Sequence, residues 1–207
     1  MYHVNYDQIL SMEKFFRINL INSVVGFKSL NLLGTTGENG ISNLCPVSSA
    51  FHLGANPPLV GLVMRPERPH NDTLKNIKAT GVYTLNNVLP EWYKAAHQTS
   101  ASYPSGVSEF SACGFTEQYV SEFRAPFVNE SSVKIGLELV ELMDVKLNGT
   151  TIVIGRISHL ITEQSLLEKD GTVDHARAKT MTVAGLDGYF LPQFLERLPY
   201  AKPEYNL

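Results

Sequence analysis

Two long strand-like runs in the carboxyl-terminal half of the chain constrain its fold more than any other feature. Residues 131–147 and 150–161 are rich in aliphatic side chains, and Asn148-Gly149 joins them. Asn-Gly between two such runs is typical of a tight turn that connects antiparallel strands. The pattern therefore predicts a long β-hairpin in an antiparallel β domain.

Shorter runs add further strands before this hairpin. We expect them over residues 27–33, 41–51, 59–64 and 82–88, with a turn at 35–40 and a break at Asn56-Pro57-Pro58. The regular alternation of strand and helix that marks a doubly wound sheet is not visible. The sequence predicts a mainly β domain with peripheral helices, and an antiparallel split or closed β-barrel is the economical way to protect its edges.

The expected helices lie at the periphery of this barrel. Apolar residues at helical spacing predict a helix within 8–23, and another should run from Asn71 or Asp72 to Thr80, where Gly81 ends it. Residues 90–126 are interpreted as an insertion with short helices near 91–99 and 114–123, since few apolar anchors are evident there. The whole chain, 1–207, is expected to form one domain.

Composition excludes several functional classes. The net charge is −3, and no basic cluster is present to bind nucleic acid. We expect no membrane association and a cytoplasmic location, because no apolar stretch is long enough to span a membrane and no secretory signal is evident. Cys45 and Cys113 are far apart, and neither they nor the histidines show the spacing of metal ligands, so no metal is expected.

Residues 42–77 concentrate the groups that could hold a small anion. This stretch contains paired serines, a Pro-flanked arginine and a predicted helix start, whereas no Gly-x-Gly-x-x-Gly or P-loop motif occurs anywhere in the chain. In order it reads Asn43-Leu-Cys-Pro-Val-Ser-Ser49, Asn56-Pro-Pro-Leu-Val60, Arg65-Pro66 and Asp72-Thr-Leu-Lys-Asn-Ile77, and Gly185-Leu-Asp-Gly-Tyr189 follows near the carboxyl end.

In this order and spacing the motifs resemble the flavin reductase-like family of FMN-binding split barrels. The similarity is clear over residues 28–88 and looser over 133–189. The resemblance implies FMN as cofactor and a homodimer with FMN in a groove near the subunit interface. It also implies, for many members, reduction of the flavin by NADH or NADPH. The flavin itself would carry the chemistry, so no catalytic side chain is assigned.

Two groups of residues are candidates for FMN binding. Arg65, Asn71, Thr73 and Lys75 could hold the phosphate through a fixed charge and the free N–H groups of a helix start. The resemblance places Cys45, Pro46, Val47, Ser48 and Ser49 along the flavin ring. Ser48 and Ser49 are expected on a strand, so their side chains point to opposite faces. The alternatives are a plain helix cap, a surface arginine, a serine pair with local hydrogen bonds, and Cys45 as a small apolar residue rather than a redox thiol.

The carboxyl-terminal region supplies weaker candidates. Tyr189 could flank the flavin ring or belong to the core, while His175 and Arg177 could meet a nicotinamide nucleotide or simply lie on the surface. The motif Val173-Asp-His175 departs from the Gly-Asp-His form of the family. Trp92 and Tyr93 could shield the site or pack the dimer.

The leading hypothesis is therefore an FMN-binding oxidoreductase of the flavin reductase type, acting on small-molecule ligands. The alternative is a flavoredoxin-like electron carrier that binds FMN without NAD(P)H activity of its own. A related split barrel that handles pyridoxal phosphate or haem is the third possibility, because a phosphate pocket alone does not exclude it.

Overall fold

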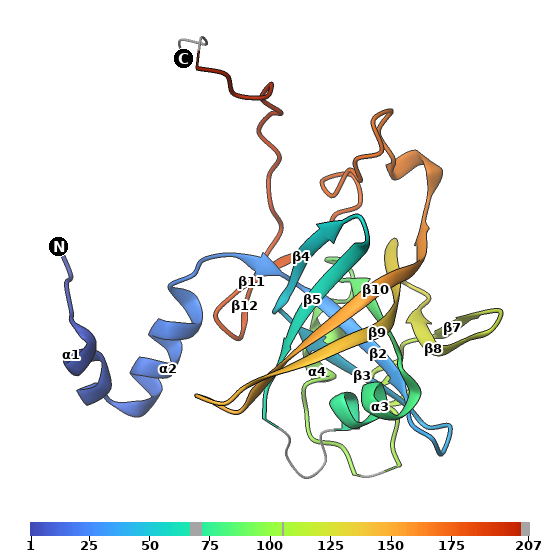
Figure 1. Cartoon of the computed structure of the whole chain (residues 1–207), viewed down its shortest axis with the longest axis horizontal. Helices are drawn as coiled ribbons and strands as arrows, with labels where there is room; N and C mark the ends of the chain where they lie inside the picture. Colours follow the sequence, from blue (N-terminus) through green and yellow to red (C-terminus); the bar gives the residue numbers. More distant parts are fainter. Residues whose placement is uncertain (67–71, 105, 204–207) are drawn as a thin grey trace.

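The computed structural model describes residues 1–66, 72–104 and 106–203, and it is mainly β with helices at the periphery (Figure 1). Seven antiparallel strands form the main sheet in the order β3-β2-β6-β9-β10-β5-β4. A three-stranded sheet, β1-β11-β12, and a two-stranded sheet, β7-β8, flank it. The strands are β1 (Lys28–Ser29), β2 (Asn31–Thr36), β3 (Ser42–Val47), β4 (Ala50–Ala55), β5 (Pro58–Met64), β6 (Val82–Asn87), β7 (Glu117–Val120), β8 (Phe123–Val128), β9 (Val133–Val145), β10 (Thr150–Thr162), β11 (Thr182–Ala184) and β12 (Gly188–Phe190).

The connection between β3 and β4 shows how the main sheet closes. These strands are consecutive in sequence but lie at the two opposite edges of the seven-stranded sheet, and only Ser48 and Ser49 join them. The strand ends that they join, Val47 and Ala50, are three residues apart and so lie within about 11 Å of each other. The sheet must therefore curl until its edges meet at this point. We call Ser48 and Ser49 the seam. The prediction of an antiparallel split β-barrel is confirmed.

The central hairpin is also confirmed. β9 and β10 pair along their full lengths, and Gly149 takes the left-handed conformation, with φ +72°. The turn is longer than the Asn-Gly motif predicts, because the outermost pair is Val145 with Thr150 and four residues lie between them. Register shifts near Gly155 and His159 bend the two strands around the barrel.

The helices include α1 (Tyr6–Ser11), α2 (Lys14–Ser23), α3 (Asp72–Thr80), α4 (Tyr93–Gln98) and α5 (Glu109–Cys113), with a single 3₁₀ turn at Gln164–Leu166. The predicted helix at 72–80 is confirmed, and Gly81 ends it with φ +72°. The region expected to form one helix within 8–23 forms two, α1 and α2, and neither contains a buried residue.

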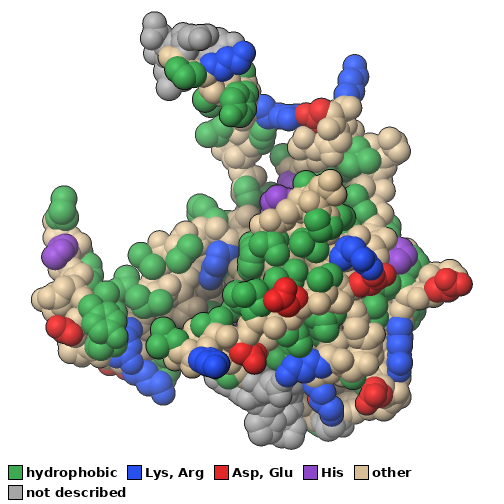
Figure 2. Space-filling model, viewed as in Figure 1, with side chains coloured by type: hydrophobic (Ala, Val, Ile, Leu, Met, Phe, Trp, Pro, Cys, Tyr) green, Lys and Arg blue, Asp and Glu red, His purple; other side chains and the backbone are tan. Residues whose placement is uncertain are grey.

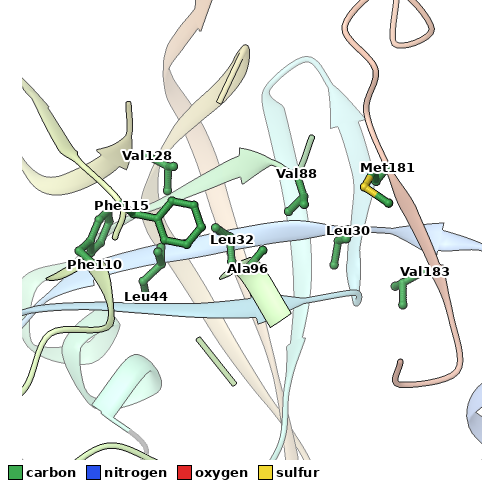
Figure 3. Packing of buried hydrophobic residues seen from close by; sticks show 10 residues of the cluster. All are labelled: Leu30, Leu32, Leu44, Val88, Ala96, Phe110, Phe115, Val128, Met181 and Val183. Carbon is green, nitrogen blue, oxygen red and sulfur yellow. The ribbon is translucent and has the colours of Figure 1, made fainter. Parts of the chain in front are cut away.

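The interpretation of residues 90–126 needs two corrections. The helix predicted at 114–123 is wrong, because Glu117–Val120 pairs with β8 as strand β7. The expectation of few apolar anchors is also wrong, since Phe110 and Phe115 are buried. Figure 3 shows these two rings packed with Leu44 and Val128 over β3, in a cluster that also contains Ala96 of α4.

A second apolar cluster fills the barrel interior. It includes Leu33, Leu62, Ile77, Tyr83 and Leu137, so α3 packs against strands from both halves of the main sheet. In the part of the chain that the structure describes, no helix is long and apolar enough to cross a membrane.

Candidate functional site

The seam places the predicted ring-binding segment at the junction of the barrel edges. Ser48 and Ser49 lie between strands rather than on one, so the expectation that they point to opposite faces of a strand is wrong. The reason is the crossing from one sheet edge to the other, which takes these residues out of both ladders. Both serines are half-buried, and the Ser49 hydroxyl donates to the Val63 carbonyl oxygen at 2.7 Å.

Cys45 and Thr73 meet on β3, the strand that leads into the seam, although they lie 28 positions apart in sequence. Thr73 lies buried in the first turn of α3, and its hydroxyl oxygen accepts a hydrogen bond from the Asn43 side-chain amide at 3.0 Å. The Cys45 Sγ lies 3.3 Å from the same oxygen. The structure thus brings two predicted site residues together, and it links the end of β3 to the start of α3.

The Cys45 thiol is not poised for thiolate chemistry. Burial raises its pKa to about 11, and the nearby Glu109 carboxylate adds to the shift, while the hydrogen bond with Thr73 opposes it. Reactive cysteines have a lowered pKa in a cationic environment. Of the two interpretations of Cys45, the structure favours the small apolar residue, which packs with Val47 against the barrel core.

The structure describes three of the four phosphate candidates, which are Arg65, Thr73 and Lys75. Asp72 is the first residue of α3 and is half-buried, so it is not the cap, and the other cap candidate, Asn71, lies outside the described residues. Arg65 is exposed directly after β5. Within the described residues Arg65 makes no hydrogen bond or ion pair with Cys45 or Thr73.

Lys75 faces a polar cavity on the other side of α3. The cavity has a volume of about 230 Å³, and its lining includes Lys75 and the three carboxylates of Glu38, Asp72 and Glu109. Burial is the main cause that raises the pKa of Glu109, although its carboxylate accepts the backbone N–H of Leu44 at 3.0 Å. This lining is unfavourable for a phosphate, because three carboxylates outnumber one lysine.

Tyr189, predicted to flank the flavin ring, belongs to the small sheet β1-β11-β12, whose strand β1 contacts Ala50 next to the seam. It stands on β12, where its hydroxyl is 2.6 Å from the Nδ1 of His97 and its ring lies 5.5 Å from the Tyr93 ring. These residues, with Lys94 and Asp187, line a shallow cavity of about 250 Å³. Sequence reasoning assigned no role to His97, because it lies 92 positions before Tyr189 and no spacing signal connects the two.

The side chains of His175 and Arg177 contact residues of the surrounding segment, 165–180. The His175 Nδ1 lies 3.0 Å from the Thr180 hydroxyl, and the Arg177 guanidinium donates to the Ser165 carbonyl oxygen. Arg177 also forms ion pairs with Glu168 at 3.3 Å and with Asp174 at 3.2 Å. Among the described residues, neither side chain contacts Tyr189 or the seam, so the structure does not assemble these predicted residues into one site.

Two buried asparagines that sequence reasoning overlooked hold the barrel beside this region. Asn86 donates to the Leu32 carbonyl oxygen at 3.0 Å and accepts the Val128 N–H at 3.0 Å. Asn87 connects β6 to the loop before β9 and to Thr180. A strand ending in two buried amides is a signal for such a network, since buried amides require partners. Within the described residues, no three His, Cys, Asp or Glu side chains gather to hold a metal ion.

The fold and the seam define a class, the antiparallel split-barrel proteins. The chain belongs to the flavin reductase like domain family, whose model matches residues 25–180. A flavin reductase candidate with a split barrel domain from Shewanella frigidimarina is 44% identical, with a TM-score of 0.92 over 97% of this chain and 100% of its own.

Two solved structures with lower identity share the fold. Flavoredoxin of Desulfovibrio vulgaris is 21% identical, with a TM-score of 0.72 over 84% of this chain and 92% of its own. An FMN-binding protein from Thermus thermophilus is 18% identical, with a TM-score of 0.68 over 84% of this chain and 91% of its own.

Proposed function

We propose that the chain binds FMN along the seam and works as a flavin-dependent oxidoreductase that receives electrons from NADH or NADPH. Membership of the flavin reductase like family supports the flavin, as do the FMN-binding protein and the flavoredoxin that share the fold. The observation that carries the proposal is the meeting of Thr73 with Cys45 on β3, the strand that leads into Ser48 and Ser49.

The residues at the seam fit the chemical needs of a flavin mononucleotide. The polar edge of the ring requires hydrogen-bond donors. Ser48 and Ser49 lie outside the strand ladders, so their backbone N–H groups and the Ser48 hydroxyl can serve, while the Ser49 hydroxyl already donates to Val63. The dimethylbenzene edge requires an apolar wall, which Cys45 and Val47 can provide. The phosphate requires cations or free N–H groups, which Arg65 and the first turn of α3 can supply.

When bound, the flavin supplies the redox chemistry by accepting and releasing two electrons. The protein holds and orients it. Arg65 neutralises the phosphate charge, the seam donates to the polar edge of the ring, and the protonated Cys45 thiol keeps the adjacent wall apolar at neutral pH. No acid or base from the chain is required for this role.

An anaerobic absorption experiment tests the proposed activity. The purified protein is loaded with FMN and mixed separately with NADH and NADPH, and the oxidised-flavin band near about 450 nm is followed. The proposal expects rapid bleaching with one or both donors. A protein that takes up no FMN contradicts the proposal as a whole.

A specific observation favours the second candidate function, an FMN-binding electron carrier without NAD(P)H activity. Arg177 is already paired with Glu168 and Asp174, and His175 lies within hydrogen-bond distance of Thr180. The groups that could meet a nicotinamide nucleotide are therefore engaged in their own loop. If the flavin band persists with both donors but disappears with dithionite, the carrier function is correct and the reductase function is not.

We also propose that two copies of the chain form a homodimer with the FMN groove near their interface. The Ser29 hydroxyl at the end of β1 donates to the Ala50 carbonyl oxygen next to the seam, at 3.2 Å. The seam therefore adjoins the amino-terminal segment, whose apolar side chains stay exposed on the single chain.

A further inference from the structure

Two segments of the chain extend from the barrel and leave large apolar side chains uncovered. The amino-terminal arm comprises residues 1–27 with α1 and α2, and the carboxyl-terminal arm comprises residues 191–203. Figure 1 shows both projecting away from the barrel, the first in blue and the second in red. The large side chains that are at least 48% exposed include Leu10, Phe15, Phe16, Ile21, Val24, Val25 and Phe27 of the first arm and Leu191, Phe194, Leu195, Leu198 and Tyr200 of the second.

Both arms leave the barrel from the same small sheet. β1 follows the amino-terminal arm and pairs with β11, while β12 precedes the carboxyl-terminal arm and pairs with β11 from the other side. At the bases of the arms the rings of Phe27 and Phe190 pack at 4.7 Å. The Lys28 ammonium donates to the carbonyl oxygens of Asn22 and Gly185, at 3.2 and 3.4 Å. These contacts hold the bases of the two arms together at the small sheet.

The exposed apolar area of the arms is as large as a stable interface requires. Large aliphatic and aromatic side chains each present on the order of 100 Å² at such exposures, so the twelve above offer roughly 1,000 Å². A stable protein interface buries about 800 Å² on each partner. Neither α1 nor α2 has a buried residue, so the single chain does not use this surface for its own core.

The barrel offers a matching apolar surface on the outer face of β4, β5, β10 and β9. Leu62 and Met64 of β5 point into the core, so Val63 between them points outward. Val63 pairs with Ile152, and Ile152 pairs with Met143, which places the three side chains in one row on the outer face. On the neighbouring row the Phe51 ring lies over Gly61. We call this surface the outer face, and Figure 2 shows apolar side chains gathered over β4, β5 and β10.

We propose that the two arms of each copy dock on the outer face of a second copy, so that two chains exchange arms in a symmetric dimer. Each copy has both the apolar arms and the outer face. In a two-fold dimer the arms of each copy cover the outer face of the other copy, so the same contact forms twice. The homodimer itself belongs to the proposed function, and this inference names the segments that form it. It does not depend on FMN, so a chain that fails to bind flavin leaves it standing.

Sedimentation equilibrium of the full chain tests the assignment. The wild type is expected to be a dimer at micromolar concentration. Phe15→Glu with Phe16→Glu in one arm, and Val63→Glu with Met143→Glu on the outer face, should each weaken the dimer by about 100-fold or more, because each buries charge in the same interface. Val107→Glu is the matched control, since Val107 is 41% exposed in a loop outside both surfaces, and it should leave the dimer intact.

Hydrogen exchange then shows whether the arms lie on the outer face. In the wild type the amides of α2 should be protected, and the outer-face variant, which leaves α2 unchanged in sequence, should remove that protection while far-UV circular dichroism confirms a folded barrel. A monomeric wild type overturns the proposal. So does a dimer that survives the arm variant, or protection of α2 that survives the outer-face variant.

Discussion

Substitutions at Tyr83 and Gly155 test the packing of the barrel interior. Tyr83 is fully buried, and within the described part of the chain its hydroxyl finds no hydrogen-bond partner. Desolvation raises the pKa of this phenol well above its usual range, so it stays neutral. A buried hydroxyl without a partner costs roughly 1–3 kcal/mol. Tyr83→Phe should therefore raise the free energy of unfolding, by about 1 kcal/mol after the loss of hydroxyl packing.

Gly155→Ala should have the opposite effect, because the new methyl group would meet the same ring. A Cβ built on Gly155 lies against the Tyr83 hydroxyl, 2.9 Å from the ring Cζ and 3.2 Å from the Leu137 Cβ. Overpacking of this kind costs about 1–3 kcal/mol. The entropic gain of Ala over Gly in a strand, about 0.5–1 kcal/mol, offsets only part of it.

The double variant, Tyr83→Phe with Gly155→Ala, tests whether the two substitutions interact. Removal of the hydroxyl relieves the closest contact of the new methyl group but leaves the Cζ contact, so the double variant should be at least about 1 kcal/mol more stable than the sum of the single effects predicts. Urea unfolding followed by circular dichroism, at one fixed protein concentration, measures all four proteins. Additive effects, or a Tyr83→Phe variant less stable than the wild type by 1 kcal/mol or more, would refute the reasoning.

Three further predictions follow from single contacts. Asn87→Ala should lower the free energy of unfolding by about 3 kcal/mol, measured by urea unfolding, because the N–H groups of Ser132 and Val133 lose their acceptor. Asn87→Asp keeps an acceptor oxygen and should cost less. Since burial raises the Cys45 pKa from 9.0 to about 11, its thiolate fraction at pH 8 falls roughly 100-fold, and alkylation followed by mass spectrometry should be correspondingly slower in the native than in the unfolded chain. Arg177→Ala should speed hydrogen exchange in the loop around Glu168 and leave FMN affinity unchanged.

The sequence predicts the strands well where side-chain pattern and turn residues agree. The β9–β10 hairpin, the apolar run of β5 and the helix ended by Gly81 all follow from local signals. The errors occur where tertiary context decides. The predicted strand at 41–51 divides at Ser48, because the chain crosses there from one edge of the main sheet to the other. Local sequence preferences cannot predict this crossing, since it depends on how the whole sheet closes.

The candidate site was harder to predict for the same reason. The contact of Cys45 with Thr73 depends on how α3 packs against β3, and the proximity of Tyr189 to His97 depends on the pairing of the small sheet with the region around α4. Motif order identified the segments, but it could not reveal the contact of Tyr189 with His97 or the ion pair of Arg177 with Glu168. The roles assigned to Ser48, Ser49 and Arg65 stay predictions.

The central claim is that the seam binds FMN through its ring and its phosphate. The most direct measurement is a parallel titration of the purified protein with FMN and with riboflavin, for the wild type, Arg65→Gln and the control Lys146→Gln, which changes an exposed lysine at the far end of the hairpin. We predict one FMN bound per chain, at least about tenfold weaker FMN binding in Arg65→Gln, unchanged riboflavin binding, and a control equal to the wild type. No FMN binding by the wild type, or an equal loss of FMN and riboflavin in Arg65→Gln, would contradict the account.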